Sequence, residues 1–449
     1  MNRLIPLKFA NLWLTCLMLA LTILILPVKS NATIFHVSKT GNDLGAGTSS
    51  SPFQTITKGV SLLSAGDTLF VHSGTYAESI LSWKTKIPNG KSWDEPIIVA
   101  AYPGDTVTIN PKSKQAFFWI QDGEAKYLII EGFVIDGLQQ AQHGLKFSNH
   151  STHIRVKNCE IKNTFDNGIL VSICSGCTDP ANYPYDTYHE FLNLDVHDNG
   201  APPSTFNAHG FYIETSHNLV EHGKFHHNAG NGGKFFHGNL RGVANHNIAR
   251  HNEFYHNSQK GKWTCGLILS SGDGNVAYNN IAYGNFAGLC ILHRVTNARL
   301  FNNIAYENTH YGIYVGFSTT NNSYVENNTV YNNSEYGIFI GDDTTNTNVI
   351  NNIAYLNKVE NISLQKQTGT TLSHNLITDP KFKNSQTKDF RLMAESPAID
   401  KGYSLDFFSD DFEGQTRPQG TAYDIGAFER ILEVDQTPPN IPKGLHVAN

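Results

Sequence analysis

The chain has 449 residues, of which 16% are charged, and its formal net charge is −6. So mild a charge argues against a nucleic-acid-binding protein, whose contact surface is strongly basic. Asparagine and glycine are abundant and long helix-forming runs are missing, which argues against a helical repeat. The length would suit two or three average domains, but elongated β folds often run this long as one unit.

The N-terminus has the pattern of a secretory signal. Arg3 and Lys8 precede an apolar run from Leu12 to Val28, and small residues follow before Thr33. This order predicts a signal peptide over residues 1–32, with cleavage near Ala32. An uncleaved membrane anchor is the alternative, because the run is near the lower length limit for a span. We therefore expect a secreted, cell-surface or periplasmic protein.

Five cysteines follow the signal segment. Cys174 and Cys177 form "CSGC" in an expected loop, where an exported protein could close a local disulfide. A zinc site would want a second such pair, and none is present. The other three cysteines lie in apolar strand-like runs, which predicts buried thiols: Cys159, Cys265 and Cys290.

From about residue 130 the sequence repeats itself, as in "NNIAYGNFAGLCI", "NNIAYENTHYGIYV" and "NNTVYNNSEYGIFI". Each unit has three short strand-like runs with asparagine at a turn. Aligning the units predicts one ladder position at Gly132, Asn158, Asn193, Gly223, Asn252, Asn280, Asn303, Asn328, Asn352 and Asn375. A second position, five residues later, holds Asn163, Asn228, Asn257, Asn285, Asn308, Asn333 and Asn357. Stacked asparagines that bond from coil to coil are the polar ladder of a β-solenoid.

With this ladder, residues 34–375 resemble the right-handed parallel β-helix of the pectate-lyase-like superfamily. The resemblance implies an all-β solenoid of about ten coils, with an N-terminal cap and first coils over 33–130 and regular repeats over 131–375. "SPFQTITKGVSLL" predicts a short capping helix whose Val60, Leu62 and Leu63 cover the open end.

The segment 376–431 resembles a C-terminal module found after β-helices in secreted bacterial proteins, through "DFRL", "SPAIDKG", "RPQG" and "YDIGAFE". We read it as a structural cap, and residues 432–449 as a linker or tail. Calcium could bind its acidic loop, although a solvated loop is the preferred interpretation. That loop contains Asp406, Asp410, Asp411 and Glu413.

The middle coils carry extra residues, for instance in "SICSGCTDPANYPYDTYHE" and "NGAPPSTFNA". Extra residues cannot enter a packed lumen, so they form outside loops. Clustered on consecutive coils, such loops build walls beside a groove for a polymer, with tolerated loop drift as the alternative. Trp83 and Trp93 in an earlier loop could stack on sugars or pack the cap.

Side chains of the groove strand alternate between lumen and exterior. In "GIYV", Tyr314 faces out, and the same register puts Lys234 beside Tyr212 and diagonal to Glu214. A shift of one residue would bury the ammonium in the lumen, which is costly, so we predict that Lys234 points outward. The predicted outward column is Lys146, Leu170, Tyr212, Lys234, Ile268, Cys290, Tyr314 and Phe339.

Residues 199–270 hold three acids against six Lys and Arg residues, and ten of the twenty histidines fall between His197 and His256. A local positive excess suits an anionic polymer, although several histidines occupy turn positions held elsewhere by asparagine. Uronic-acid polymers are cleaved by β-elimination, for which a lysine of lowered pKa is a suitable base. The predicted catalytic residues are Lys234, Tyr212, Glu214, His209, His237 and Arg241, and the predicted substrate-binding residues are Lys146, Lys260, Trp263, His293 and Arg294.

Family-nine polysaccharide lyases use a lysine base on a β-helix, in a stretch similar to "NAGNGGKF". The resemblance implies an aspartate-rich calcium site, but this chain has Asn228 and Asn231 near the lysine. Calcium therefore stays an open cofactor, with His209, His237, Arg241, His293 or Arg294 as alternative partners for the substrate carboxylate. A histidine-bound metal is a further alternative.

The sequence thus predicts a monomeric lyase for an acidic polysaccharide, with three alternatives. A uronate epimerase could use the same fold. A glycoside hydrolase would need two carboxylates, for which Glu214 has only Asp195, Asp198 and Glu221 as candidate helpers. A non-catalytic carbohydrate-binding or surface protein is the third, because fold does not determine function.

Overall fold

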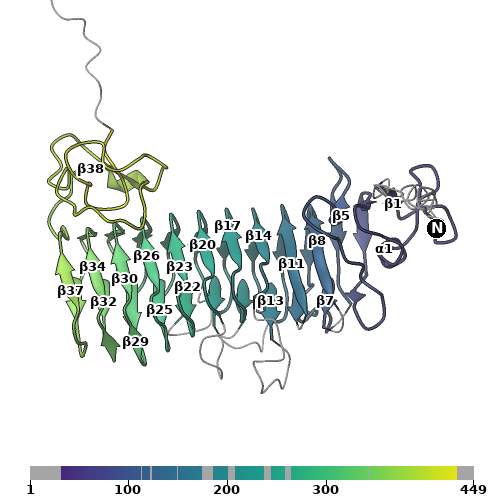
Figure 1. Ribbon diagram of the computed structural model, residues 1–449, viewed down its shortest axis with the longest axis horizontal. Coiled ribbons are helices and arrows are strands. Elements are labelled where there is room, and N and C mark those ends of the chain that lie inside the picture. Colours follow the sequence, from purple (N-terminus) through teal and green to yellow (C-terminus); the bar gives the residue numbers. More distant parts are fainter. Residues whose placement is uncertain are drawn as a thin grey trace, which may run out of the picture.

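The structure is a computed structural model that describes residues 32–112, 114–121, 124–148, 150–173, 186–200, 208–236, 244–257, 264–341 and 343–431. Its body is one long parallel β-solenoid, with the N-terminal end and the C-terminal module at opposite ends (Figure 1). The predicted all-β solenoid is confirmed. No helix in the described ranges is both long and apolar enough to cross a membrane.

Each coil contributes one strand to each of three parallel sheets, so sequence neighbours lie in different sheets. Sheet 1 contains, in spatial order, β1 (Ile34–Val37), β2 (Thr68–Val71), β5 (Ile97–Ala101), β8 (Ala125–Glu131), β11 (Ser151–Lys157), β14 (Glu190–Leu192), β17 (Leu219–Glu221), β20 (Ile248–Arg250), β23 (Val276–Tyr278), β26 (Arg299–Phe301), β30 (Tyr324–Glu326), β34 (Asn348–Ile350) and β37 (Thr371–Ser373).

Sheet 2 contains β3 (Gly74–Tyr76), β6 (Val107–Ile109), β9 (Phe133–Asp136), β12 (Glu160–Lys162), β15 (Asp195–His197), β18 (Lys224–His226), β21 (Glu253–Tyr255), β24 (Ile281–Tyr283), β27 (Ile304–Tyr306), β31 (Thr329–Tyr331) and β35 (Ile353–Tyr355). Sheet 3 contains β4 (Ile80–Leu81), β7 (Phe118–Ile120), β10 (Leu145–Ser148), β13 (Ile169–Ser172), β16 (Phe211–Ile213), β19 (Gly233–Phe235), β22 (Cys265–Ser270), β25 (Ala287–Leu292), β28 (Tyr311–Gly316), β32 (Tyr336–Ile340) and β36 (Glu360–Leu364). A small pair, β29 (Thr320–Asn321) and β33 (Thr344–Thr345), lies outside these sheets.

The lumen is packed with apolar side chains from all three sheets. Phe211, Phe225, Phe235 and Phe254 are fully buried there, and the rings of Phe225 and Phe254 stack with centroids 5.3 Å apart. Alternation along each short strand produces this core, because every second side chain must point inward.

Asparagine ladders line the corners of the lumen. Asn280 Nδ2 donates to Asn303 Oδ1 at 3.0 Å, and Asn303 donates to Asn328 in the same way. An amide both donates and accepts, so each coil satisfies the next without water. The first predicted ladder is confirmed from Asn252 onward and the second from Asn228 onward. A third ladder, which the alignment did not reveal, runs through Asn218, Asn247 and Asn275.

The early positions of both predicted ladders lie one residue before the buried ladders, although Asn193 Nδ2 does donate to Asn158 Oδ1 of the preceding coil at 2.8 Å. Asn158 and Asn193 are exposed and adopt φ of 55° and 51°, so they occupy the turn position just before the ladder. The ladder position of those coils holds buried Cys159 and Leu194 instead. Gly132, with φ of 79°, and Asn163, with φ of 54°, are turn residues too.

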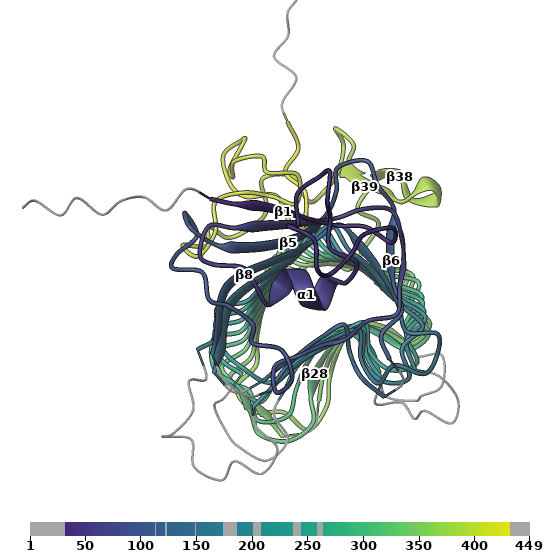
Figure 2. The same ribbon diagram turned by 90° about the vertical axis from the view of Figure 1, so that its right-hand side faces the viewer.

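A short helix, α1 (Ile56–Val60), covers the N-terminal mouth of the lumen (Figure 2). Its N-cap Thr55 accepts from the backbone of Lys58, which satisfies an otherwise free helix donor. Val60 and Leu63 are buried as predicted, whereas Leu62 is 44% exposed and does not cover the end.

The C-terminal module lies against the side of the last coils, above them in Figure 1. It contains the antiparallel pair β38 (Phe382–Asn384) and β39 (Asp389–Leu392) with a 3-10 turn, Ser385–Thr387, between them. Phe390 packs on Tyr306 and Tyr331 of sheet 2, with ring centroids 5.5 and 5.3 Å apart.

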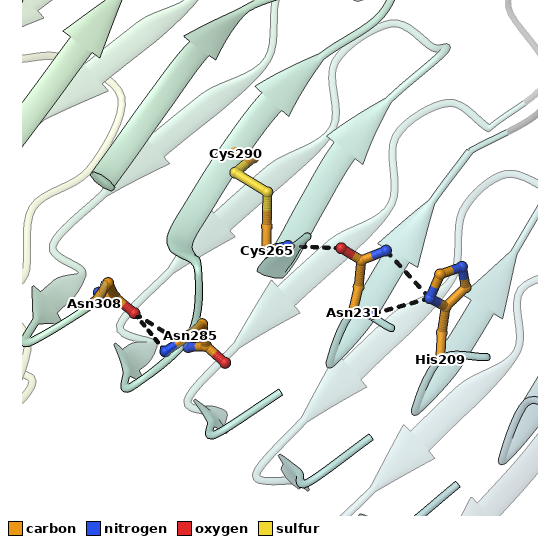
Figure 3. The surroundings of a disulfide bond; sticks show 6 residues. All are labelled: His209, Asn231, Cys265, Asn285, Cys290 and Asn308. Carbon is orange, nitrogen blue, oxygen red and sulfur yellow. Dashed lines mark hydrogen bonds between the residues drawn. A yellow bond between two sulfur atoms is a disulfide. The ribbon is translucent and has the colours of Figure 1, made fainter. Parts of the chain in front are cut away.

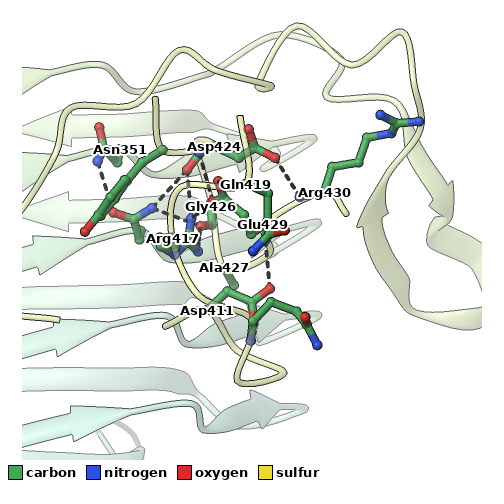
Figure 4. A network of polar contacts seen from close by, with 12 residues as sticks. Asn351, Asp411, Arg417, Gln419, Asp424, Gly426, Ala427, Glu429 and Arg430 are labelled. Carbon is green, nitrogen blue, oxygen red and sulfur yellow. Dashed lines mark hydrogen bonds and ion pairs between the residues drawn. The ribbon is translucent and has the colours of Figure 1, made fainter. Parts of the chain in front are cut away.

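The "RPQG" and "YDIGAFE" motifs of the module form its polar core (Figure 4). Arg417 of "RPQG" pairs with Glu429 of "YDIGAFE" at 2.7 Å, with both side chains essentially inaccessible. The Arg417 guanidinium also donates to the carbonyls of Asp424 and Gly426. Asp411 is buried and accepts from the backbone of Glu429, so it is a structural residue and not part of a solvated or calcium-binding loop.

Candidate active site

The predicted outward column of sheet 3 is confirmed by the strand register. Lys146 pairs with Leu170, Leu170 with Tyr212, and Tyr212 with Lys234. Gly233 and Phe235, on either side of Lys234, are buried, which fixes the lysine on the outer face. The column continues through Ile268, Cys290, Tyr314 and Phe339.

Lys234 lies between two aromatic rings. Its Nζ is 3.9 Å from the ring centroid of Phe236 and 5.2 Å from that of Tyr212. These rings exclude water while their faces attract the ammonium. Burial lowers the pKa of Lys234 to about 8, against the opposing effect of the nearby Glu214 carboxylate. A substantial fraction of this lysine is therefore neutral near physiological pH.

Glu214 follows β16 and points to the same face as Tyr212, two residues earlier. Burial raises the pKa of Glu214 to about 7, opposed by a hydrogen bond from Tyr212 and by the charges of Lys146 and Lys234. Burial, the Glu214 charge and this hydrogen bond raise the pKa of Tyr212, so its phenol stays protonated. The strand register thus places Lys234 beside Tyr212, and the Tyr212 phenol hydrogen-bonds to Glu214.

A second group of charges lies at β7 and β10 of the same face. Lys146 Nζ is 4.4 Å from the ring centroid of Trp119, and burial lowers the pKa of this lysine. Asp166, which precedes β13, has a pKa raised by burial to about 6, with the Lys146 charge opposing the rise. Sequence reasoning missed Asp166 and Trp119. Trp119 could have been found by extending the column, because it pairs with Lys146.

His209 is buried just before β16, where it bonds to Asn231 of the next coil (Figure 3). Its Nδ1 accepts from the backbone N–H of Asn231 at 3.0 Å, and Asn231 Oδ1 accepts from the backbone N–H of Cys265 at 2.7 Å. Burial and the charge of Lys234 lower the pKa of His209, so it is neutral. His209 is a positioning residue of the strand that carries Lys234.

Cys265 and Cys290 form a disulfide on the outer face of sheet 3, so the prediction of two buried thiols is wrong. Cys159 is a free buried thiol, as predicted. Register alone does not pair the two, because Cys265 lies opposite Ala287 while Cys290 lies opposite Ile268. Three extended residues would span about 10 Å. The Cα atoms of the two cysteines are only 6.3 Å apart, so the chain bends sharply after Cys265.

A cavity of about 350 Å³ adjoins this disulfide. His293 belongs to its lining and contacts Phe236 with ring centroids 5.9 Å apart, which connects the cavity to Lys234. Burial, with the charges of Lys234 and Arg294, lowers the pKa of His293 to about 4, so this ring is neutral. The other lining residues are Cys265, Phe286, Ala287, Leu292, Tyr314 and Phe317.

Models of known protein families that match this chain describe the same right-handed β-helix. A model of the Pel9A-like right-handed β-helix region matches residues 35–315, more than half of the chain. The chain belongs to the Pel9A-like right-handed β-helix family. A general model of the right-handed β-helix region also matches residues 256–389.

Solved structures similar to this Pel9A-like chain are distant in sequence. Pectate lyase Pel9A has a TM-score of 0.52 and 16% identity, covering 89% of this chain and 96% of that chain. PL6 family alginate lyase AlyGC has a TM-score of 0.48 and 17% identity, covering 74% of this chain and 51% of its own. A glycoside hydrolase has a TM-score of 0.49 and 10% identity, covering 81% of this chain and 99% of that chain. Such identities show a shared fold. No curated protein matches the chain.

The calcium site implied by the family does not fit the described residues around Lys234 of this Pel9A-like protein. Calcium takes six to eight oxygen ligands. Asn228 belongs to a ladder, and Asn231 Oδ1 accepts from the backbone N–H of Cys265, so both side chains are already engaged. Among the described residues, Glu214 is the carboxylate whose charge acts on Lys234. We derive no catalytic step through calcium.

Some of the residues predicted for the site of this Pel9A-like chain do not lie beside Lys234. Arg294 is exposed at the turn after β25. Asp195 lies on sheet 2 and Glu221 on sheet 1, with Asp198 just after β15, so the prediction of these three as helpers of Glu214 is wrong. Several predictions lie outside the described residues: His237, Arg241, Lys260, Trp263, Cys174, Cys177, the signal segment, the tail and most of the two long loops.

Most of the ten histidines between His197 and His256 have a structural role. Six of the ten adopt φ between 50° and 61°, the left-handed turn conformation for which Asn and His are enriched. Their rings stack from coil to coil, as His217 does on His246 with centroids 5.2 Å apart. These six are His217, His222, His227, His246, His251 and His256.

The two tryptophans of the early loop differ. Trp93 packs against Tyr127 and under Arg155, whose guanidinium is 4.1 Å from the ring centroid, so it is structural. Trp83 is 44% exposed and meets Trp119 edge to face at 5.6 Å. The pair Trp83 and Trp119 therefore presents an aromatic surface at the N-terminal end of the Lys234 column.

Proposed function

We propose that this Pel9A-like protein is a polysaccharide lyase that cleaves uronic-acid-containing chains by β-elimination, with Lys234 as the base. The observation that carries the proposal is a half-buried lysine on the outer face of sheet 3, with its pKa lowered to about 8. An amine with a pKa near the working pH combines basicity with a useful neutral fraction. We also propose a secreted, monomeric enzyme.

In this reaction neutral Lys234 takes the C5 proton of a uronate. The electron pair forms the C4–C5 double bond, and the C4–O glycosidic bond breaks. The leaving oxygen needs a proton, which the Tyr212 phenol can supply because its raised pKa keeps it protonated. The negative charge of Glu214 stabilises the protonated form of Lys234 between turnovers. His209 positions the strand that carries Lys234 through its bond to the backbone of Asn231.

Neighbouring surfaces support binding of a long anionic chain. Three strand spacings, about 14 Å, separate Lys146 from Lys234, so Lys146 serves a carboxylate several sugars away. Trp83 and Trp119 suit stacking on a sugar ring farther along. On the other side, the cavity beside His293 suits the apolar face of a sugar.

The carboxylate beside the reacting carbon still requires a cationic or hydrogen-bonding partner. His293 is neutral, so it can serve only as a hydrogen-bond donor. We propose Arg241 for the cationic role and His237 as a further candidate, because both follow the strand of Lys234 in the sequence. Arg294, Lys260 and Trp263 remain proposed contacts of the flanking sugars.

The test is incubation with pectic, alginate-like and glycosaminoglycan polymers while following the ultraviolet absorbance of unsaturated uronates. The wild type should generate the signal, and Lys234→Ala should lower the rate at least 100-fold, the usual contribution of a general base. Lys112→Ala, an exposed lysine on the chain before β7 and several coils from Lys234, is the matched control and should keep the wild-type rate. Activity that survives in Lys234→Ala would contradict the assignment.

Hydrolysis is the second candidate, because two carboxylates of this face have pKa values raised by burial and both lie near the charge of Lys146. Asp166 and Glu214 have pKa values of about 6 and 7, and both feel the charge of Lys146. A glycosidase needs such a pair, one protonated and one ionised. New reducing ends without ultraviolet absorbance, lost in Asp166→Asn, would establish hydrolysis.

Two other outcomes have their own signatures. An epimerase also removes the C5 proton but returns one to the opposite face, which changes the sugar signals in NMR without shortening the polymer. A binding protein would retain polymers and change none of them.

A further inference from the structure

We propose that the sugars bound beyond Lys234, over β22, β25 and β28, carry no free carboxylate. The substrate is then an acidic polysaccharide in which uronates occur together with uncharged sugars, either neutral sugars or esterified uronates. This inference rests on the function proposed for Lys234, and it names the substrate class of the same face of sheet 3.

The outer face of sheet 3 changes character at Lys234. On the side of the earlier coils, the strand register aligns Trp119, Lys146 and Tyr212 with Lys234, and Glu214 follows the strand of Tyr212. On the side of the later coils, β22, β25, β28 and β32 contain no charged residue. A polymer lying along this face therefore meets cations on one side of the lysine and an apolar surface on the other.

The apolar side is one continuous hydrophobic cluster. Tyr311 stacks on Tyr336 with ring centroids 5.7 Å apart and on Tyr314 with centroids 5.0 Å apart. The disulfide between Cys265 and Cys290 joins β22 to β25 beside these rings (Figure 3). Because the disulfide and the ring stacking hold it, this surface is formed before any ligand binds. The rest of the cluster is Ile268, Phe286, Ala287, Leu292 and Phe339.

The cavity of about 350 Å³ described above opens on this cluster. Binding sites for small ligands usually measure about 300–1,000 Å³ and are mainly apolar. Phe286, Tyr314 and Phe317 supply aromatic rings to its wall, and Phe317 is 54% exposed at the rim. Aromatic rings of this kind pack well against the C–H faces of a sugar.

The cavity is connected to the base. His293 belongs to the lining, and its ring centroid lies 5.9 Å from that of Phe236. Phe236 in turn covers the Lys234 ammonium at 3.9 Å. A sugar in the cavity would therefore belong to the same chain as the uronate at Lys234 and lie close to it.

A carboxylate is disfavoured in this cavity. The faces of aromatic rings are negative, so they attract cations and repel anions. Among the described lining residues only His293 has a basic side chain, and its pKa of about 4 keeps it neutral. Arg294 lies on an exposed turn, where water screens its charge. A carboxylate would lose its water without gaining a buried partner, whereas an uncharged sugar avoids this cost.

The test compares three polymers: a polyuronate with free carboxylates, the same polymer partly methyl-esterified, and a polymer in which uronates alternate with a neutral sugar. The wild-type kcat/KM should be at least about 10-fold higher on one of the last two, the discrimination that an apolar pocket achieves for a single methylene group. The better of the two identifies the uncharged sugar. The highest kcat/KM on the free polyuronate would overturn the inference.

A charge placed at the rim provides the matched variant. Phe317→Arg should raise kcat/KM on the free polyuronate and remove the preference for the uncharged sugar. Leu356→Arg is the control, because Leu356 is 50% exposed with φ of 57°, close to the 54% and 58° of Phe317, but lies on a turn after β35 of sheet 2. It should keep the wild-type preference. An unchanged preference in Phe317→Arg would contradict the cavity as the cause.

Calorimetry on Lys234→Ala separates this inference from the lyase proposal, because binding is then measured without cleavage. Oligosaccharides of the preferred polymer should bind at least about 10-fold more tightly than free oligouronates, and Phe317→Arg in the same background should cancel the difference. This result without unsaturated products in the wild type would refute the lyase alone. Equal or tighter binding of the free oligouronates would overturn the inference alone.

Discussion

Lys234 illustrates how a sheet surface can change the chemistry of one side chain. Phe236 and Tyr212 remove water from around the ammonium, and burial lowers its pKa to about 8. Glu214 acts in the opposite direction, because its negative charge stabilises the protonated amine. The reactivity of this lysine is therefore set by a balance between two neighbours that the strand register determines.

This balance predicts the pH dependence of the lyase reaction. The base must be neutral, so the rate should rise with pH and level off above about pH 8. Glu214→Gln removes the charge that raises the pKa of Lys234, so the midpoint should move to lower pH while activity remains. Initial rates from pH 6 to pH 10 check this, over roughly two units on either side of the pKa.

The same variant separates the two candidate reactions. In a glycosidase, Glu214 would be one of the two essential carboxylates, and Glu214→Gln would abolish activity at every pH. A midpoint that stays at the wild-type pH in an active variant would show that Glu214 does not control the base. Lys112→Ala serves as the control for the profile.

Residue-level prediction from sequence succeeded where geometry is periodic. Alternation alone was enough to place Lys234 outside the lumen beside Tyr212 and Glu214. The disulfide was not predicted, because Cys265 and Cys290 are not opposite each other in the strand register and come close only through a bend of the chain after Cys265. Asp166 escaped because it lies before its strand, outside the alternating pattern.

At the scale of elements, each coil turn carries two adjacent positions that favour asparagine for different reasons. Asn279 adopts φ of 52° and belongs to the left-handed turn. Asn280 is fully buried and joins the coils before and after it through its amide. A sequence alignment cannot separate the two in coils with a single asparagine, which explains the error at Asn158 and Asn193.

Substitution of this dipeptide should separate the two roles. Asn280→Ala leaves the backbone N–H of Asn252 and the carbonyl of Ala249 without their partners. At about 1–3 kcal/mol for each buried orphan group, the loss should be on the order of 3 kcal/mol in the free energy of unfolding. Urea denaturation followed by circular dichroism measures it.

Asn279→Gly is the matched control for this loss. Glycine adopts a positive φ readily, and the Asn279 Oδ1 has no hydrogen-bond partner among the described residues, so the change should stay within about 1 kcal/mol. Equal losses in the two variants would mean that the ladder contributes no more than the turn.

At the scale of the molecule, the three sheets of one solenoid carry different surfaces. Sheet 3 presents the Lys234 column, and sheet 2 carries the His197–His226 pair near its middle and the C-terminal module on its last coils. The sequence was sufficient for the solenoid because its repeats are regular. It could not indicate that the module packs on a side of the coils, because those contacts join residues as far apart as Asn302 and Arg417.

The fold of this module contains one fully buried ion pair, Arg417 with Glu429, which yields a prediction for the whole molecule. Glu429 accepts from Arg417, from the backbone of Asp424 and from the backbone of Gln419. In Glu429→Gln the buried guanidinium loses its paired carboxylate, and the new amide N–H groups face existing donors. Removing one partner of a buried pair typically costs about 3–5 kcal/mol, so the module should open far more often.

Hydrogen exchange can locate that cost. In Glu429→Gln, amides of residues 398–429 should exchange at least 100-fold faster, because about 3 kcal/mol corresponds to that factor. Coils near Lys234, distant from the module, should keep their protection. Asp389→Asn breaks the exposed pair with Arg391 in the same module and should change exchange little, since such pairs contribute at most about 1 kcal/mol. Uniform acceleration along the whole chain would instead mean that module and solenoid unfold as one unit, because opening of the module alone leaves the remote coils intact.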